Sequence, residues 1–307
     1  LVVVYMVNGL SGLSVKILGA GVALWQNGNH LSRLDIFETR GMRMGKIGTF
    51  PFGQPILKVE QKNRAQKQVF VLGVYASAVH ARWIGPDGKQ LISALGVASE
   101  PEIFWRGDGV DEIVDSIDIP EGAGRLVPAS PNLNGPSGQA LDDCYLKPLG
   151  LGREDVWLCD LVPYSCMNGG QARALIRAYE PRATKLGLPE FCWNPVPVTL
   201  ADDDRRTQIE GEIAETRPEI LITLGDQPLK WFSRFHGSKS TLAGYGTDEM
   251  MYGRIHRIRI NGQELGLLPL VHPRQAGRLG RFSVRWAALH EKWAAGKAAE
   301  MPIEREQ

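Results

Sequence analysis

Four short runs of apolar residues constrain the fold more than any other feature of this sequence. Each run has the length of a strand and little polar alternation, which is the pattern of a strand buried on both faces of a parallel sheet. Stretches with helical composition separate the runs. This alternation predicts an α/β fold with a mostly parallel sheet. The runs lie at residues 68–74, 155–162, 219–225 and 264–271.

Each apolar run leads into a loop with glycine or polar residues. In an open α/β sheet, the loops at the carboxyl ends of the strands build the ligand site. His272 stands in the last of these loops, and we expect it to take part in chemistry, although a histidine before proline is often only a turn residue. Asp160 ends its run among apolar neighbours, so its carboxylate is costly to bury unless it caps local amides or reads a ligand. The other two exits are around Gly73 and Gly225.

Further elements surround these strands. A loop rich in Pro, Asn, Ser and Gly at residues 128–138 precedes a predicted helix, whose start at Ser137 and Gly138 offers amides to a phosphate or a base carbonyl. Capping without any ligand is the commoner explanation of such a start. A hairpin with an Asn-Gly turn places a strand at 251–260 beside the last apolar run. The predicted helices cover residues 110–117, 139–147, 171–186, 203–216, 227–235 and 281–300.

The distribution of charge is more informative than the total. The formal net charge is +1, but residues 227–292 hold eleven Lys or Arg against four Asp or Glu, a local charge of +7. This favours a basic face and a phosphate-bearing ligand, although an arginine row is by default a solvated face. The four cysteines form no CxxC pair and have no histidine at zinc-finger spacing. We therefore expect no metal, no iron–sulfur cluster and no cofactor.

The N-terminal segment, residues 1–49, is left without a structural assignment. Its apolar opening lacks a basic region, is interrupted by Lys16 and is too short to span a membrane. We expect one domain over residues 50–298, a polar tail over 299–307, no membrane association, and a cytoplasmic monomer.

Taken in order, these motifs resemble those of the uracil-DNA glycosylase superfamily, and most of all its family-four-type branch. The similarity covers roughly residues 68–293. It implies a three-layer α/β/α sandwich around a mostly parallel four-stranded sheet. It also implies a DNA-repair enzyme that flips a base out of DNA and hydrolyses its N-glycosidic bond. The motifs are Gly-Pro-Ser-Gly-Gln-Ala-Leu-Asp-Asp at 135–143, the runs ending at Asp160 and Gly225, and His272-Pro273.

The resemblance assigns a role to each motif. The first motif, residues 73–77, positions water, Asp160 reads the base, and His272 donates to the charge that develops on the leaving base. His272 and Tyr75 are the catalytic candidates, and either Tyr75 or Trp83 stacks on the base. Tyr75 is equally well explained as a packed core residue. The remaining candidates are the substrate-binding residues Gly73, Val74, Ala76, Ser77, Ser137 and Gly138 and the DNA-binding residues Pro273, Arg274, Arg278 and Arg281.

The sequence departs from the family pattern at two functional positions. Tyr75 or Ala76 stands where active members carry Asp or Asn, so any carboxylate base must come from elsewhere, with Asp142 or Asp143 as candidates. Asp160 stands where an asparagine would read uracil. Because an ionised carboxylate only accepts hydrogen bonds, we expect it to repel uracil O4 and to favour an exocyclic amine. The iron–sulfur cysteines of the branch are also missing.

Three functions therefore compete. The first is a glycosylase of altered base specificity that acts on single- or double-stranded DNA. The second is a nucleic-acid-binding member of the superfamily without catalytic activity. The third is an enzyme that acts on free nucleosides or nucleotides, because a shared fold does not decide function. A steep loss of DNA binding with rising salt would separate the first two from the third.

Overall fold

The computed structural model describes residues 13–18, 21–26, 47–236, 239–278 and 283–300. The chain divides into two compact units, Leu1–Gly45 and Lys46–Gln307. The first contains an antiparallel hairpin of β1 (Leu13–Leu18) and β2 (Gly21–Gln26). Among the residues described, none of the helices combines the length and the hydrophobicity needed to cross a bilayer.

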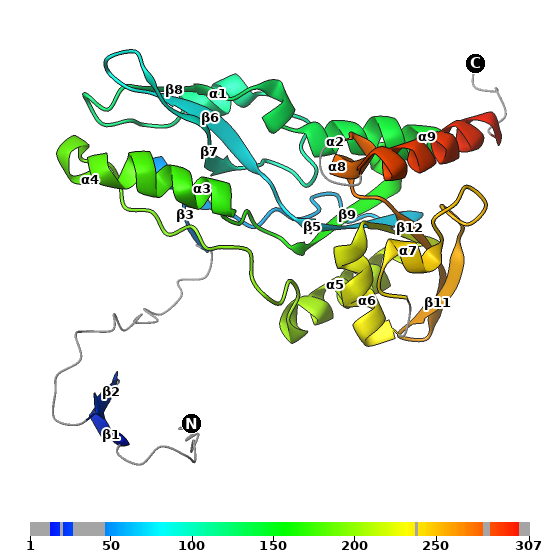
Figure 1. Ribbon diagram of the computed structural model, residues 1–307. Helices are drawn as coiled ribbons and strands as arrows, with labels where there is room; N and C mark the ends of the chain where they lie inside the picture. Colours follow the sequence, from blue (N-terminus) through cyan, green and yellow to red (C-terminus); the bar gives the residue numbers. More distant parts are fainter. Residues whose placement is uncertain (1–12, 19–20, 27–46, 237–238, 279–282, 301–307) are drawn as a thin grey trace. The chain divides into compact units, whose positions relative to one another are not determined.

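A five-stranded sheet, parallel except at one edge, forms the centre of the second unit (Figure 1). The strand order is β11-β12-β10-β5-β9. The four parallel strands contain the four apolar runs, so the predicted α/β fold and mostly parallel sheet are confirmed. They are β5 (Val69–Tyr75), β9 (Val156–Val162), β10 (Ile220–Leu224) and β12 (Gln263–Leu270).

The sheet has five strands where the resemblance implied four. The fifth, β11 (His256–Ile260), is the first strand of the predicted hairpin and pairs antiparallel with β12 along its whole length. Asn261 and Gly262 connect the two strands with φ values of 47° and 85°. Positive φ at both central residues is typical of the type I′ turn, whose twist matches that of the flanking strands. The hairpin therefore extends the sheet by one edge strand.

Helices lie on both sides of this sheet (Figure 1). On one side α5 contacts β9, and α6 contacts β10 and β5. On the other side α8 contacts both α2 and α9. The predicted helix over 203–216 has the bounds observed for α5, where Asp202 caps the first turn by accepting from the Arg205 N–H. These helices are α2 (Pro136–Leu141), α5 (Asp203–Thr216), α6 (Asp226–His236), α7 (Leu242–Tyr245), α8 (Pro273–Ala276) and α9 (Ser283–Glu300).

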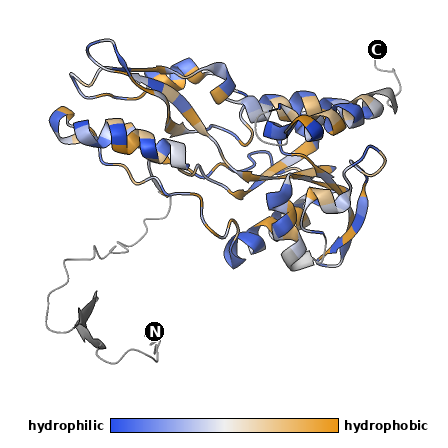
Figure 2. Cartoon of the chain, viewed as in Figure 1, coloured by the Kyte–Doolittle hydropathy of each residue, from blue (hydrophilic) through white to orange (hydrophobic). Residues whose placement is uncertain are grey.

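A second sheet of three antiparallel strands, in the order β7-β6-β8, was not predicted as a sheet. It packs over its own aromatic core, which includes Phe52, Trp83, Tyr179 and Trp193. The helices α3 and α4 beside it alternate hydrophilic and hydrophobic residues (Figure 2), as helices that cover a core do. The elements are β6 (Ala78–Ile84), β7 (Gln90–Ser99), β8 (Arg125–Pro128), α1 (Val110–Asp115), α3 (Gly169–Ala174) and α4 (Glu180–Leu186).

Short elements complete the second unit. Two-residue strands β3 and β4 pair antiparallel near its start. A π-helical segment joins α3 to α4, and another follows α2. The bounds are β3 (Gly48–Thr49), β4 (Pro55–Ile56), η1 (Pro51–Gly53), η2 (Pro131–Leu133), η3 (Asp142–Leu146), η4 (Lys147–Leu149), η5 (Arg153–Asp155) and η6 (Leu175–Tyr179).

Candidate functional site

The carboxyl ends of the four parallel strands bring the predicted loops to one edge of the sheet. Gly73 in β5 and Asp160 in β9 are register partners. Gly225 follows β10 and lies against His272, which follows β12: a Cβ atom on Gly225 would be 3.0 Å from the Cβ of His272. Because β10 lies between β12 and β5, the four loops form one continuous row. This edge of the sheet is the candidate site.

Asp160 presents a buried carboxyl group to this edge. The residue is 4% exposed, and its carboxyl oxygens accept no hydrogen bond from any residue that the structure describes. Burial raises the pKa of Asp160 to about 7, although the nearby charge of Arg205 acts in the opposite direction. At neutral pH the carboxyl is therefore partly protonated and able to donate. The expectation that Asp160 repels uracil O4 applies to its ionised form and stays a prediction.

Gly73 is required for the close approach of Asp160. A Cβ atom at this position would lie 2.2 Å from the Asp160 Oδ1 atom and 2.8 Å from the Phe104 Cζ atom. Phe104, which sequence analysis missed, therefore lays its ring beside the carboxyl group. Its φ of 53° is unusual for a bulky residue, and backbone strain of this kind concentrates at functional sites. Gly73, Asp160 and Phe104 form one packed group.

Glu100 is a second buried carboxyl at this edge, also missed from the sequence. It follows the last residue of β7, and its Oε1 atom accepts from the Ser77 N–H at 3.0 Å. Burial, and then the charge of Asp160, raise the pKa of Glu100 to about 8. The signal that pointed to Asp160, a carboxylate at the end of an apolar strand, was present here too. It was not recognised because β7 contains residues of mixed burial and not a continuous apolar run.

His272 is held as a neutral imidazole with a free donor. It caps the start of α8, where its Nδ1 atom accepts from the Arg274 N–H at 3.2 Å. Burial, and after it the charge of Arg274, lower the pKa of His272 to about 4. Since Nδ1 accepts, the proton of the neutral ring sits on Nε2. This N–H has no acceptor among the described residues, which leaves it available to a ligand.

Two tyrosines clamp the peptide groups that precede His272. The Tyr145 hydroxyl donates to the Val271 carbonyl at 2.8 Å, and the Tyr252 hydroxyl accepts from the Val271 N–H at 3.1 Å. The Tyr252 hydroxyl in turn lies 2.8 Å from the Nδ1 atom of His290. Because the Nε2 atom of His290 contacts a carbonyl oxygen and must donate to it, Nδ1 accepts from Tyr252. The hydrogen bonds thus fix the loop backbone.

Replacing Tyr252 with phenylalanine should lower the free energy of unfolding by about 1–3 kcal/mol, because it leaves the buried Val271 N–H and the His290 Nδ1 atom without partners. Urea denaturation measures this change. Tyr164→Phe is the matched control, since the Tyr164 hydroxyl has no hydrogen bond with a described residue, and it should change stability by no more than about 0.5 kcal/mol. Equal effects of the two substitutions would contradict the proposed clamp.

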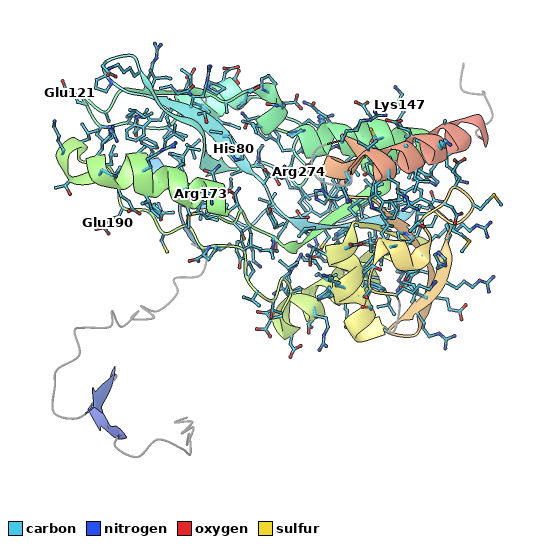
Figure 3. The ribbon with its side chains drawn as sticks, viewed as in Figure 1. His80, Glu121, Lys147, Arg173, Glu190 and Arg274 are labelled. Carbon is cyan, nitrogen blue, oxygen red and sulfur yellow. The ribbon has the colours of Figure 1, made fainter. Side chains whose placement is uncertain are left out.

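The predicted DNA-binding residues differ in their surroundings. Pro273 is buried as the first residue of α8, whereas Arg274 on the same helix is exposed and forms no ion pair with a described residue (Figure 3). Arg278 binds both carboxylate oxygens of Glu291, at 2.8 and 3.0 Å. Arg281 lies outside the described residues. Of the predicted DNA-binding arginines that the structure describes, Arg274 is therefore more available to a phosphate than Arg278.

The first-motif residues divide between exposed and packed positions. Tyr75 ends β5 and is 40% exposed, so it remains a candidate stacking residue. Val74 is half-buried, Ser77 is exposed, and the buried Ala76 donates its N–H to the Val162 carbonyl. The alternative stacking residue, Trp83, was predicted wrongly. It is fully buried in the aromatic core and donates to a backbone carbonyl.

The start of α2 is packed against the loop that carries Phe104. A Cβ atom on Gly138 would lie 2.1 Å from the Phe104 carbonyl oxygen, so close packing accounts for this glycine without a ligand. Ser137 is half-buried beside it. Asp142, one of the two alternative carboxylates, is paired with Arg153 at 2.8 Å. That ion pair occupies Asp142 and leaves it poorly suited to act as a base.

Two cavities in the structure lie away from the candidate edge. One, of about 240 Å³, is lined by residues that include Tyr164 and Arg205, and the other, of about 560 Å³, lies at the start of β5 and β10. Asp160 and His272 line neither. Since Asp160, Glu100 and Phe104 are each less than a tenth exposed, the candidate edge is closed in this conformation, and ligand entry requires side chains to shift.

No protein-family model matches the sequence, and no curated protein matches it. Within the described part of the chain, no group of three or more His, Cys, Asp or Glu side chains is arranged to hold a metal ion.

Proposed function

We propose that this chain is a DNA glycosylase-like protein with a three-layer α/β/α sandwich of the uracil-DNA glycosylase type. It would bind single- or double-stranded DNA as a monomer and hydrolyse the N-glycosidic bond of a deaminated or modified base that is flipped out of the stack. The main support is one observation. A neutral His272, whose Nε2–H has no acceptor among the described residues, stands in the same row of strand ends as Asp160, whose carboxyl oxygens accept no hydrogen bond from those residues.

The chemistry follows from these two groups. Asp160 meets the polar edge of the base while the Phe104 ring packs against its face. As the bond to the sugar breaks, negative charge develops on the base, and the His272 Nε2–H donates to it. The neutral imidazole can still donate through Nε2–H. The hydrogen-bonded loop holds this donor in place before the charge appears, which is what makes a fixed donor effective in the transition state. Arg274 contacts a flanking phosphate, which orients the strand without reading its sequence.

The second candidate function is that of a nucleic-acid-binding protein without catalytic activity. It is favoured by the lack of a carboxylate among residues 73–77 and by the ion pair that engages Asp142. Such a protein would still bind nucleic acid through Arg274 and the basic C-terminal region, but it would release no base. The two candidates therefore differ in one measurable property.

A base-release assay tests the proposal. End-labelled oligonucleotides that carry uracil, hypoxanthine, xanthine or only unmodified bases, single- and double-stranded, are incubated with the full chain, and strand breaks are counted after alkali. We expect release of one modified base, reduced on the order of 100-fold by His272→Ala, which removes the donor to the developing charge. His256→Ala, on edge strand β11, is the matched histidine control and should retain the parent rate.

Two results would contradict the proposal. Release that is unaffected by His272→Ala would remove this residue from the mechanism. No release from any oligonucleotide, with salt-sensitive binding retained, would identify the nucleic-acid-binding protein without catalytic activity instead.

A further inference from the structure

We propose that the larger of the two cavities, at the start of β5 and β10, binds a small amphipathic anion with an apolar body and one carboxylate. Asp160 and His272 stand at the other ends of the parallel strands, so this is a second ligand site. The inference does not depend on the proposed glycosylase activity.

The cavity has the size and the apolar lining of a small-molecule site. Its volume of about 560 Å³ falls within the usual range of about 300–1,000 Å³. Ile220 on β10 is the register partner of Val69 on β5 and of Gly266 on β12, so the three residues face the same side of the sheet. This side of the sheet can therefore hold the apolar body of a ligand. The other apolar residues that line the cavity are Leu149, Leu151, Ile222, Ile255 and Leu268.

The loop before β11 and helix α9 form the wall that faces the sheet. A Cβ atom on Gly266 would lie 2.6 Å from the Ile255 Cγ2 atom, so this glycine makes room for the loop on the sheet. A Cβ atom on Gly253 would lie 2.2 Å from the Cδ1 atom of Trp293, so a second glycine lets the same loop reach α9. Lys297, one turn further along α9, lines the cavity. Close packing at the two glycines therefore shapes this wall.

The polar groups at this wall favour an anion. Arg254 is exposed, lines the cavity and has no hydrogen bond or ion pair with a described residue. Lys297 brings a second positive charge to the lining. The buried indole N–H of Trp293, beside Gly253, has no acceptor among the described residues. These groups are all donors, and a guanidinium can bind a carboxylate through two parallel hydrogen bonds.

Glu219 is the acidic residue of the lining. Its N–H donates to the Gln68 carbonyl, and its own carbonyl accepts from the Gly266 N–H, each at 2.9 Å, so its backbone continues the ladder of β10. Successive side chains of an extended strand point to opposite faces of the sheet, which directs the Glu219 carboxylate away from the face of Ile220. The charge that the lining presents to a ligand on that face is therefore positive.

Titration with decanoate tests the inference. The full chain, with ¹³C-labelled Ile and Leu methyl groups, is titrated with decanoate and with decylammonium, which has the same alkyl chain and the opposite charge. We expect saturable binding of decanoate that shifts the methyl resonances of Ile222 and Leu268, and weaker binding of decylammonium. Arg254→Gln should weaken decanoate binding by about two- to fivefold, the effect of one exposed ion pair. Arg257→Gln, on the neighbouring β11 but outside the lining, is the matched control and should bind as the parent does.

A second variant tests the apolar part of the site. Leu151→Trp puts a larger side chain into the lining and should weaken decanoate binding by at least about tenfold, because it takes up the volume that the alkyl chain needs. Ile176→Trp is the control, since Ile176 is 62% exposed and lies in η6, away from the cavity. It should retain the parent affinity.

Three results would overturn the inference. The first is the absence of saturable decanoate binding by the parent. The second is equal affinity for decanoate and decylammonium with no effect of Arg254→Gln, which would show that the cavity does not select an anion. The third is a shift of the Ile222 and Leu268 resonances with protein concentration alone, which would show that a second copy of the chain covers the cavity.

Discussion

Arg205→Met should lower the free energy of unfolding by about 3–5 kcal/mol, which is the usual effect of removing one partner from a buried ion pair. The Arg205 side chain is nearly buried, and its Nη1 atom lies 3.1 Å from the Oε1 atom of Glu212, which is also nearly buried. The same guanidinium donates to the backbone carbonyls of Asp160 at 2.7 Å and Leu161 at 3.3 Å. The substitution therefore leaves the Glu212 charge with only the Trp157 indole N–H as a described donor, and it removes one donor from each of the two carbonyls.

The neighbouring Arg206 provides the control for this measurement. It also forms ion pairs on α5, but with the exposed carboxylate of Asp203 and with Glu210 nearer the surface. Exposed pairs contribute about 0–1 kcal/mol, so Arg206→Met should have a small effect in the same urea titration. Similar losses for the two variants would show that Arg205 is not a buried anchor. Loss of Arg205 should also raise the pKa of Asp160, because its charge opposes the effect of burial.

Gly73→Ala should both destabilise the protein by about 1–3 kcal/mol and abolish most base release. The added methyl group would meet the Asp160 Oδ1 atom and the Phe104 ring at distances that no real Cβ atom tolerates, so one of them must move. A shift of about 1 Å in a positioning group costs on the order of 100-fold in rate. We therefore expect at least about 100-fold slower release of whichever base the parent removes.

Gly211→Ala is the matched substitution, with an opposite expected sign. Gly211 lies in the interior of α5, and a Cβ atom there would meet nothing within 4 Å. Alanine should therefore stabilise the helix by about 0.5–1 kcal/mol and leave base release unchanged. Gly73→Ala protein that is as stable and as active as the parent would show that the packed group at Asp160 adapts freely. In that case the close approach would have no functional meaning.

The central strands were predictable because a few consecutive residues are enough to indicate that each strand is buried. A strand that is covered on both faces needs apolar residues at every position, and the four runs have them. The Asn261-Gly262 turn was equally local, since both residues adopt positive φ with little strain. The three-stranded sheet was harder to predict. Its strand β7 contains residues of mixed burial and runs into an irregular loop, so the end of the strand at Ser99 was not recognised.

The candidate site residues also divide into those indicated by local sequence and those that depend on contacts with distant segments. His272 and Asp160 were found because each stands at the end of an apolar run, which is a property of a few consecutive residues. Glu100 stands at such a position too, but its relevance depends on a partner, Ser77, that is 23 residues away. The place of Phe104 beside Gly73 depends equally on a loop that belongs to another sheet. Contacts of this kind leave no periodic trace in the sequence.

The local pattern of residues in the sequence therefore accounts for which segments are strands, for the hairpin, and for the presence of Asp160 and His272 at strand ends. The protonation states of these residues required the folded structure. The pKa values of Asp160 and Glu100 rise, and that of His272 falls, mainly because packing removes water from each group. The charge of Asp160 adds to the rise at Glu100, whereas the charge of Arg205 opposes the rise at Asp160. Desolvation depends on every neighbour in space, and most of those neighbours are far apart in the chain.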